Sequence, residues 1–212
     1  MIMRILWVSV VVGLFAGCGS VRGPATKYYN LDVPLAPTPA GPSTPVSLRI
    51  EPFRTASLLR QDRIIYRPSP VEVGFYEYHR WAEPPNHAVT KALADQLMRR
   101  GVFQSVEISD GGEKADYVLR GSIDRLQEVD YLGAVRAQVS ISAELEDPVR
   151  RQIVWSSAAS SECVVAKSDV RAVVAAMGQA SQQSIERLVA EVAKFVKLNE
   201  LATASSAVSQ PR

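Results

Sequence analysis

The chain has 212 residues, of which 47% are hydrophobic, and its 24 Lys and Arg residues against 22 Asp and Glu residues give a formal net charge of +2. The basic residues are scattered along the sequence. The clustered positive charge of a nucleic-acid-binding protein is therefore missing, and we expect no nucleic-acid partner.

The N-terminus has the layout of a secretory signal. Arg4 supplies a positive charge, residues 5–16 form an apolar run (ILWVSVVVGLFA), and small residues follow. Twelve apolar residues are too few to span a bilayer core about 30 Å thick, which needs roughly 20. The end of the run, LFAGCGS, resembles the lipobox of bacterial lipoproteins, although Phe15 stands where Leu is usual. We predict a lipoprotein signal peptide at 1–17 and lipid attachment at Cys18; the alternative is an ordinary signal peptide with an incidental Cys.

Lipidation of Cys18 predicts firm membrane attachment. A buried methylene contributes about 0.8 kcal/mol, so one acyl chain holds weakly and two or more hold stably. A bacterial lipoprotein carries three. The next residue is Gly19 rather than the Asp that commonly retains such proteins in the inner membrane. We therefore predict an outer-membrane lipoprotein that faces the periplasm.

The second cysteine, Cys163, is left alone once Cys18 is lipidated, so the exported chain has no internal disulfide. It lies in the segment SSECVVA, which has a strand-like composition. We predict a small buried hydrophobic residue. A reactive or intermolecularly paired thiol is the alternative.

Prolines dominate the stretch that follows the lipid site, residues 18–45. Proline favours extended geometry and has no N–H to donate to a sheet. We predict a tether that lifts a folded domain off the membrane, interrupted by a short edge strand at 27–31 (KYYNL).

The folded domain is predicted at 46–199, followed by a disordered tail at 200–212. Alternation predicts a half-buried strand at 46–53, and two β-rich runs follow at 63–67 and 71–78.

The next element is a predicted helix over 84–101. Two prolines precede its first turn, where their missing N–H costs nothing. Val89, Leu93 and Leu97 share one face. Gly101 suits the left-handed conformation that closes a helix.

The clearest pattern lies at 135–145, where apolar and polar residues alternate without a break. This predicts a strand with one buried and one wet face, as in antiparallel sheets. Segments 116–131 and 151–165 are its predicted neighbours. A long helix follows, with Ser168 as N-cap and Asp169 in its first turn. Its apolar stripe is predicted to pack on the sheet, with a partner-helix or lipid face as the alternative: Val170, Val174, Met177, Ser181, Ile185, Leu188, Val192 and Phe195.

The predicted order β-β-β-α-β-β-β-β-α defines the fold class. We expect a single α+β domain with a mixed, mostly antiparallel β-sheet packed with two main helices.

The segment 75–85 (FYEYHRWAEPP) is the richest in reactive side chains, yet no catalytic constellation accompanies it. RGSID is not a G-x-S-x-G nucleophile elbow, and no phosphate-binding Gly loop is present. His79 and His87 lack metal-ligand partners at zinc-like spacing. We predict no enzymatic activity, no cofactor and no metal. A periplasmic hydrolase using His79 or Glu77 is a remote alternative.

The order of motifs resembles a known family. A YY-x-L run (Tyr28, Tyr29, Leu31) precedes RIEPF, then RIIYR, an aromatic strand leading into YHRWAEPP, and a helix ending LMRRGVF. Together these resemble the ABC-type transport auxiliary lipoproteins, the family of PqiC-like outer-membrane lipoproteins. The resemblance implies a non-catalytic subunit that docks an inner-membrane MCE-type protein and permease complex. Such systems move lipids between the two membranes and support envelope integrity. A homo-oligomeric ring is also implied.

Within YHRWAEPP, two interpretations of the aromatic and basic residues stay open. Tyr78, Arg80 and Trp81 either form a partner-docking surface, for which such residues are typical anchors, or join a strand to a helix, with Trp81 packed across the corner. For the whole protein, the alternative function is an outer-membrane assembly or structural lipoprotein without lipid cargo.

Overall fold

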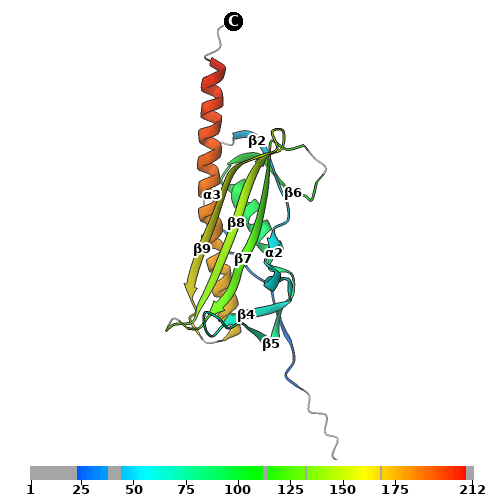
Figure 1. Cartoon of the computed structure of the whole chain (residues 1–212), viewed down its shortest axis with the longest axis vertical. Coiled ribbons are helices and arrows are strands. Elements are labelled where there is room, and N and C mark those ends of the chain that lie inside the picture. The colour runs from blue at the N-terminus through cyan, green and yellow to red at the C-terminus, as the bar shows by residue number, and fades with distance from the viewer. Residues whose placement is uncertain (1–22, 38–43, 112–113, 132, 168, 209–212) are drawn as a thin grey trace, which may run out of the picture.

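The computed structural model describes residues 23–37, 44–111, 114–131, 133–167 and 169–208. It contains a mixed nine-stranded sheet and two long helices, which confirms the predicted α+β class (Figure 1). The elements, in chain order, are β1 (Lys27–Tyr29), β2 (Thr44–Ile50), β3 (Arg54–Thr55), a 3-10 turn η1 (Ser57–Arg60), β4 (Arg63–Arg67), β5 (Gly74–Trp81), α2 (Pro85–Arg99), β6 (Phe103–Ile108), β7 (Tyr117–Val129), β8 (Arg136–Asp147), β9 (Gln152–Val164) and α3 (Val170–Val208).

The sheet is organised around the long strand β7. One edge of β7 pairs antiparallel with β8, which pairs antiparallel with β9. The other edge is shared along its length by β2, β3 and β4, all parallel to β7. Strand β6 extends the sheet beyond β2, while β5 and then β1 extend it beyond β4. Long strands therefore pair antiparallel and the short ones mostly parallel.

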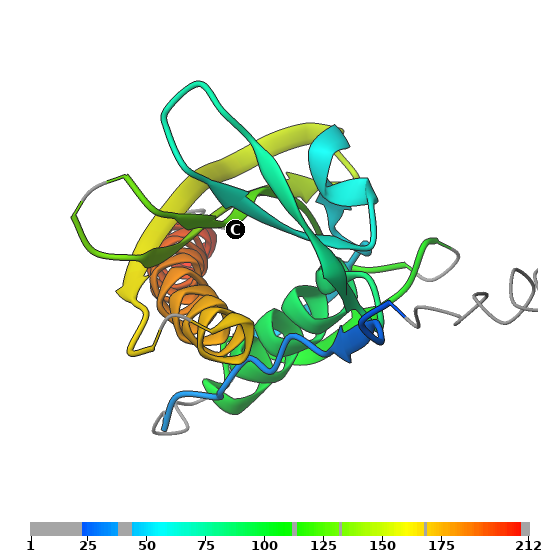
Figure 2. The same cartoon turned by 90° about the horizontal axis from the view of Figure 1, so that it is seen from below.

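Strand β8 confirms the alternation seen in the sequence. Ala137, Val139, Ile141, Ala143 and Leu145 are buried, and the residues between them are partly or fully exposed. The buried side chains face helix α3, which runs along the sheet beside α2 (Figure 2). The predicted stripe of α3 is buried from Val170 to Val192, with Phe195 partly buried, so it packs on the sheet as predicted.

Both helices begin and end as local chemistry requires. Helix α2 starts at Pro85 and closes at Gly101, whose φ is 65° and whose N–H donates to the Met98 carbonyl at 3.0 Å. At the start of α3 the Asp169 carboxylate accepts the Ala172 N–H at 2.8 Å, so Asp169 caps this helix. Ser168, the predicted cap, lies outside the described residues.

Helix α3 continues to Val208, beyond the predicted end of the domain at 199. The prediction of a disordered tail from 200 is therefore wrong through Val208. Leu and Ala are strong helix formers, and adding a residue to an existing helix avoids the cost of nucleation. Among the described residues, no helix combines the length and apolarity needed to cross a bilayer.

The predicted tether at 18–45 is corrected by the packing of residues 30–37, which we call the strap. Leu31 and Ala36 are buried, and the strap lies against α2 and α3, over Ala92 and Ile185 among others. Just before the strap, β1 pairs with β5, within the predicted 27–31 strand. Burying the apolar side chains of the strap against α2 and α3 is more favourable than leaving them exposed to water in an extended tether. From Lys27 to the end of the strap, the chain therefore belongs to the domain.

Candidate functional site

The segment 75–85 forms most of strand β5 and the corner that leads into α2. Trp81 is only 5% exposed, and its backbone N–H donates to the Asp62 carbonyl at 2.6 Å. Trp81 is therefore buried in the core where β5 leads into α2. Arg80 is partly exposed and forms an ion pair with Asp62 at 2.7 Å. Tyr78 is also partly exposed, and its hydrogen bond with the Glu77 carboxylate raises the pKa of its hydroxyl.

His79 on β5 contacts Tyr29 on β1. Its Nδ1 and the Tyr29 hydroxyl are 2.8 Å apart, within hydrogen-bond distance, and the two rings stack with centroids 5.6 Å apart. Burial, and secondarily the charge of Lys27, lowers the pKa of His79. A lowered pKa favours the neutral imidazole, which lies in a contact between two strands.

A buried carboxyl that the sequence analysis missed lies on β7. The Tyr76 hydroxyl donates to Glu128 Oε2 at 2.5 Å, and Glu128 is buried. Burial raises the pKa of Glu128, although the bond from Tyr76 acts in the opposite direction. Burial and the neighbouring Glu128 also raise the pKa of Tyr76. A register shift after Ile123 helps to turn Glu128 inward, and the sequence carries no signal for that shift.

A groove of about 770 Å³ opens at the upper end of the sheet in Figure 1, opposite the end where the described chain begins. We call it the upper groove. Three separate segments form it: the start of β2, the residues leading into β7, and the β8–β9 turn. Its lining residues are Val46, Ser47, Arg49, Lys114, Ala115, Asp116, Tyr117, Val118, Asp147, Pro148, Val149 and Arg150.

Hydrogen bonds between Ser47 and Asp116 fix two walls of the upper groove. The Asp116 carboxylate accepts both the backbone N–H and the hydroxyl of Ser47 at 2.7 Å. These bonds, the backbone one first, lower the pKa of Asp116 and keep it charged. On the side of α3, Asn199 Nδ2 donates to the Tyr117 hydroxyl at 2.8 Å.

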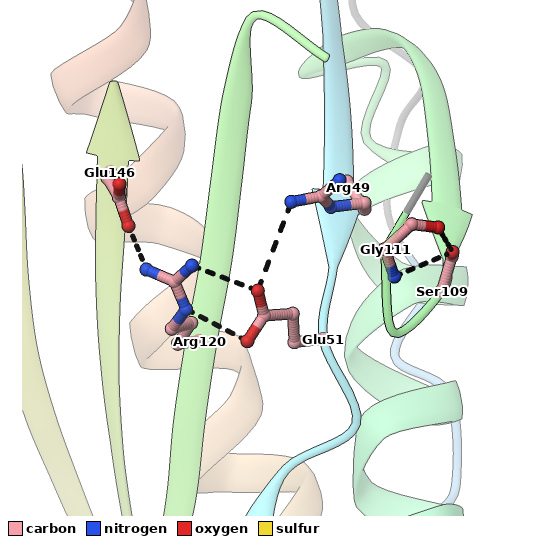
Figure 3. A network of polar contacts seen from close by, with 6 residues as sticks. All are labelled: Arg49, Glu51, Ser109, Gly111, Arg120 and Glu146. Carbon is pink, nitrogen blue, oxygen red and sulfur yellow. Dashed lines mark hydrogen bonds and ion pairs between the residues drawn. The ribbon is translucent and has the colours of Figure 1, made fainter. Parts of the chain in front are cut away.

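Beside the groove, a guanidinium joins three parts of the sheet (Figure 3). Arg120 on β7 binds both carboxylate oxygens of Glu51, at 2.8 and 3.0 Å, and also binds Glu146 on β8. Arg49, which lines the groove, lies 3.9 Å from Glu51. This bidentate pairing holds the Arg120 side chain against the sheet surface. A short turn after β6, closed by Ser109 and Gly111, lies near this network.

The upper groove combines apolar side chains such as Val46 and Val149 with the charges of Arg49, Lys114 and Arg150. The groove can therefore make both apolar and polar contacts. The described residues contain no group of three or more His, Cys, Asp or Glu side chains arranged to hold a metal ion. Sequence analysis missed the groove because its walls lie up to about a hundred residues apart in the chain.

Of the two cysteines, only Cys163 lies within the described residues. Cys18, the predicted lipid site, lies outside the described residues. Cys163 lies on β9 as a free thiol, packed against the core but only partly buried. Burial raises the pKa of its thiol, and Gln183 Nε2 lies 3.5 Å from its sulfur. A raised pKa disfavours the reactive thiolate, in keeping with a structural residue.

The architecture recurs in two crystal structures. A protein from Xanthomonas campestris shares 22% identity, with 82% of this chain covering 99% of that one at a TM-score of 0.73. An uncharacterised protein shares 17% identity, with 80% of this chain covering 99% of that one at a TM-score of 0.61. At such identities the likeness concerns the fold alone.

The sequence matches the family described as ABC-type transport auxiliary lipoprotein component over residues 29–190. The chain therefore belongs to this family, as the motif resemblance predicted. The match includes β1 to β9 apart from the first two residues of β1, as well as the first half of α3. A comparison with curated proteins gave no match.

Proposed function

We propose that this protein is an outer-membrane lipoprotein, anchored through Cys18 and facing the periplasm, that serves as a docking or relay subunit of an MCE-type intermembrane lipid-transport system. The observation that carries the proposal is the family match over residues 29–190, directly behind a lipobox-like sequence. The family is a transport auxiliary lipoprotein, and MCE-type systems are the partners that the resemblance implies.

A docking role is supported by how the interior is filled. Most of the buried side chains between α3 and the sheet are apolar, among them Met177, Leu188 and Ile141. Protein interiors of this kind are close-packed, so an acyl chain would have to displace them. The upper groove is open and partly charged, which suits a protein segment better than a hydrocarbon chain.

A non-catalytic role is supported by the structural contacts that the reactive side chains already make. His79, the residue most suited to hydrolysis, is held by Tyr29. Arg120 is paired with the carboxylates of Glu51 and Glu146 on the sheet surface. Each of these groups already has a structural function.

The test is affinity purification of the full lipidated protein from cell envelopes. We expect co-purification of an MCE protein with its permease complex, and a native mass that corresponds to a homo-oligomeric ring. Recovery of a barrel assembly factor or of peptidoglycan in its place would favour the alternative of an assembly or structural lipoprotein. Cys18→Ala should abolish outer-membrane fractionation without unfolding the domain. Loss of the gene should sensitise cells to detergents.

Two substitutions, one in the upper groove and one outside it, test whether the partner binds at the groove. Val149→Glu places a charge in the groove and should reduce recovery of the MCE partner. Met98 on α2 is also exposed and lies outside the groove lining, so Met98→Glu is the matched control and should retain the partner. Equal recovery with both variants would exclude the groove as the docking site.

A further inference from the structure

The described chain begins close to where the proposed lipid anchor must be. Gly23 follows Cys18 by five residues, and five residues span at most about 18 Å. Figure 1 shows this N-terminal segment leaving the molecule at its lower end. Helix α3 runs the opposite way, and its 39 residues are about 58 Å long. The anchor can therefore lie near the lower end but not near the C-terminal end of α3.

The lower end carries exposed apolar side chains at the ends of three neighbouring strands. Val71 in the β4–β5 turn is 94% exposed, Val164 at the end of β9 is 63% exposed, and Tyr131 after β7 is 38% exposed. The sheet register brings these places together. Arg67 pairs with Val129, which pairs with Arg136, which in turn pairs with Val164. Figure 2 looks onto this end and shows the two turns and the end of β9 following one another along one side.

Hydrogen bonds hold the β4–β5 turn that presents Val71. The Glu72 N–H donates to the Ser69 carbonyl at 3.4 Å and to its hydroxyl at 3.2 Å. Arg67 links the turn to β7: its Nη1 donates to the Pro70 carbonyl at 3.5 Å and its Nε donates to Gln127 Oε1 at 2.8 Å. The backbone of the turn is held by these hydrogen bonds, and the turn presents the Val71 side chain to solvent.

We propose that this lower end rests on the phospholipid surface of the membrane that holds the anchor, with Val71, Tyr131 and Val164 inserted at the boundary between headgroups and acyl chains. The inference rests on the proposed lipidation of Cys18. Apolar and tyrosine side chains favour this boundary, where a ring buries its body and keeps its hydroxyl wet. The consequence is a fixed orientation, with α3 and the upper groove pointing away from the membrane.

Exposed apolar residues also occur at the other end, which supplies an internal control. Val149 lies in the β8–β9 turn and is 88% exposed, so it matches Val71 in residue type, exposure and position in a turn. The two differ in their place along the long axis of the molecule. If the anchor sets the orientation, the membrane contacts Val71 and not Val149. Non-specific adsorption of exposed valines would affect both positions equally.

The experiment uses the full lipidated protein with Cys163→Ala, carrying either Val71→Cys or Val149→Cys labelled with an environment-sensitive fluorophore. The proteins are reconstituted into vesicles of phosphatidylethanolamine and phosphatidylglycerol that contain a lipid with a nitroxide near the headgroup. We expect a blue shift and quenching for the probe at 71, and an unchanged spectrum for the probe at 149. Circular dichroism checks that both variants are folded.

The outcomes separate this inference from the proposed function. Vesicle flotation with equal spectra at both positions, or with quenching at 149 alone, overturns the orientation and leaves the anchor intact. Disulfide-linked dimers through position 71, without quenching, would assign the lower end to a contact between copies and would also overturn it. Protein that fails to float lacks its anchor, which overturns both proposals.

Discussion

Replacing Gly178 with alanine tests whether the strap belongs to the folded domain. Gly178 lies on α3 directly beneath the strap, and a Cβ at this position would overlap the backbone carbonyl oxygen of Asp32. In a helix interior, alanine is normally favoured over glycine by about 1 kcal/mol. The two interpretations of residues 18–45 therefore predict opposite signs: a packed strap makes the substitution destabilising, and a loose tether makes it stabilising.

The size of the effect follows from what the strap buries. Asp32 can move away from a new Cβ only if the strap lifts, and Leu31 and Ala36 then lose their places against the helices. Full burial of a Leu side chain contributes about 1.5–3 kcal/mol, and the smaller neighbours add to this. A loss of about 3 kcal/mol, offset by about 1 kcal/mol of helix propensity, leaves a net destabilisation of about 2 kcal/mol.

Urea unfolding of a chain that lacks the signal and carries Cys18→Ala measures this difference. We expect a lower midpoint with an unchanged m-value, and a melting temperature lower by about 4–8 °C for a domain of this size. Gln179→Ala, at the exposed neighbouring position, is the control and should change stability by less than about 0.5 kcal/mol. In a Leu31→Ala background the effect of Gly178→Ala should shrink, because both changes release the same strap. Stabilisation by Gly178→Ala would refute the reasoning and restore the tether.

Three further predictions concern charged groups. Glu128→Gln removes a carboxyl whose pKa burial raises above 4.5, so wild type should lose stability relative to the variant as the pH rises from 4.5 through the raised pKa, by about 1.4 kcal/mol per unit of pKa difference. Urea titrations that give the same difference from pH 4 to pH 8 would contradict this. Asp169→Ala should cost about 1 kcal/mol in thermal unfolding because the Ala172 N–H loses its acceptor, whereas Asp169→Asn should cost much less. Arg120→Met leaves Glu51 and Glu146 without their shared guanidinium beside the groove; we expect a loss of about 1 kcal/mol in urea unfolding at pH 7, and an unchanged free energy of unfolding would contradict this.

The sequence predicted the elements whose side chains alternate between a core and water. Strand β8 and helix α3 were placed by periodicity alone, because each buries one face against the other and any shift in register would expose that face. The ends of α2 were predictable for a different reason. Pro85 and Gly101 act through their own backbone geometry, which needs no tertiary partner.

The strap was not predictable from local rules. Six prolines between Gly23 and Val46 favour an extended chain, and extended geometry alone does not distinguish a coil in solvent from a chain laid across two helices. The groove that receives residues 33–36 is formed by α2 and α3, which lie some 60 and 150 residues further along the chain. The upper groove escaped prediction for the same reason.

The segment 75–85 shows how tertiary partners change the meaning of a sequence. Its histidine and tryptophan suggested either chemistry or recognition. The His79 side chain instead contacts Tyr29, 50 residues away, and Trp81 is buried in the core. Arg80 and Tyr78 keep part of their surface, but they lie on β5, in the half of the molecule nearer the proposed anchor. A partner that arrives from the inner membrane would meet the upper groove before it met Arg80.

The packed strap also changes what the anchor does for docking. A free tether from 18 to 45 would let the domain sample a wide volume above the membrane, and a partner would have to overcome that freedom when it binds. With the chain held from Lys27 through the strap, only eight residues separate the fold from Cys18. With the proposed anchor at Cys18, the height of the upper groove above the membrane would be set by the folded sheet and α3. Much of the entropy cost of positioning the proposed docking site would then be met when the domain folds. A subunit that receives a partner across the periplasm benefits from such a fixed height, whereas a carrier that shuttles between membranes would need a long tether.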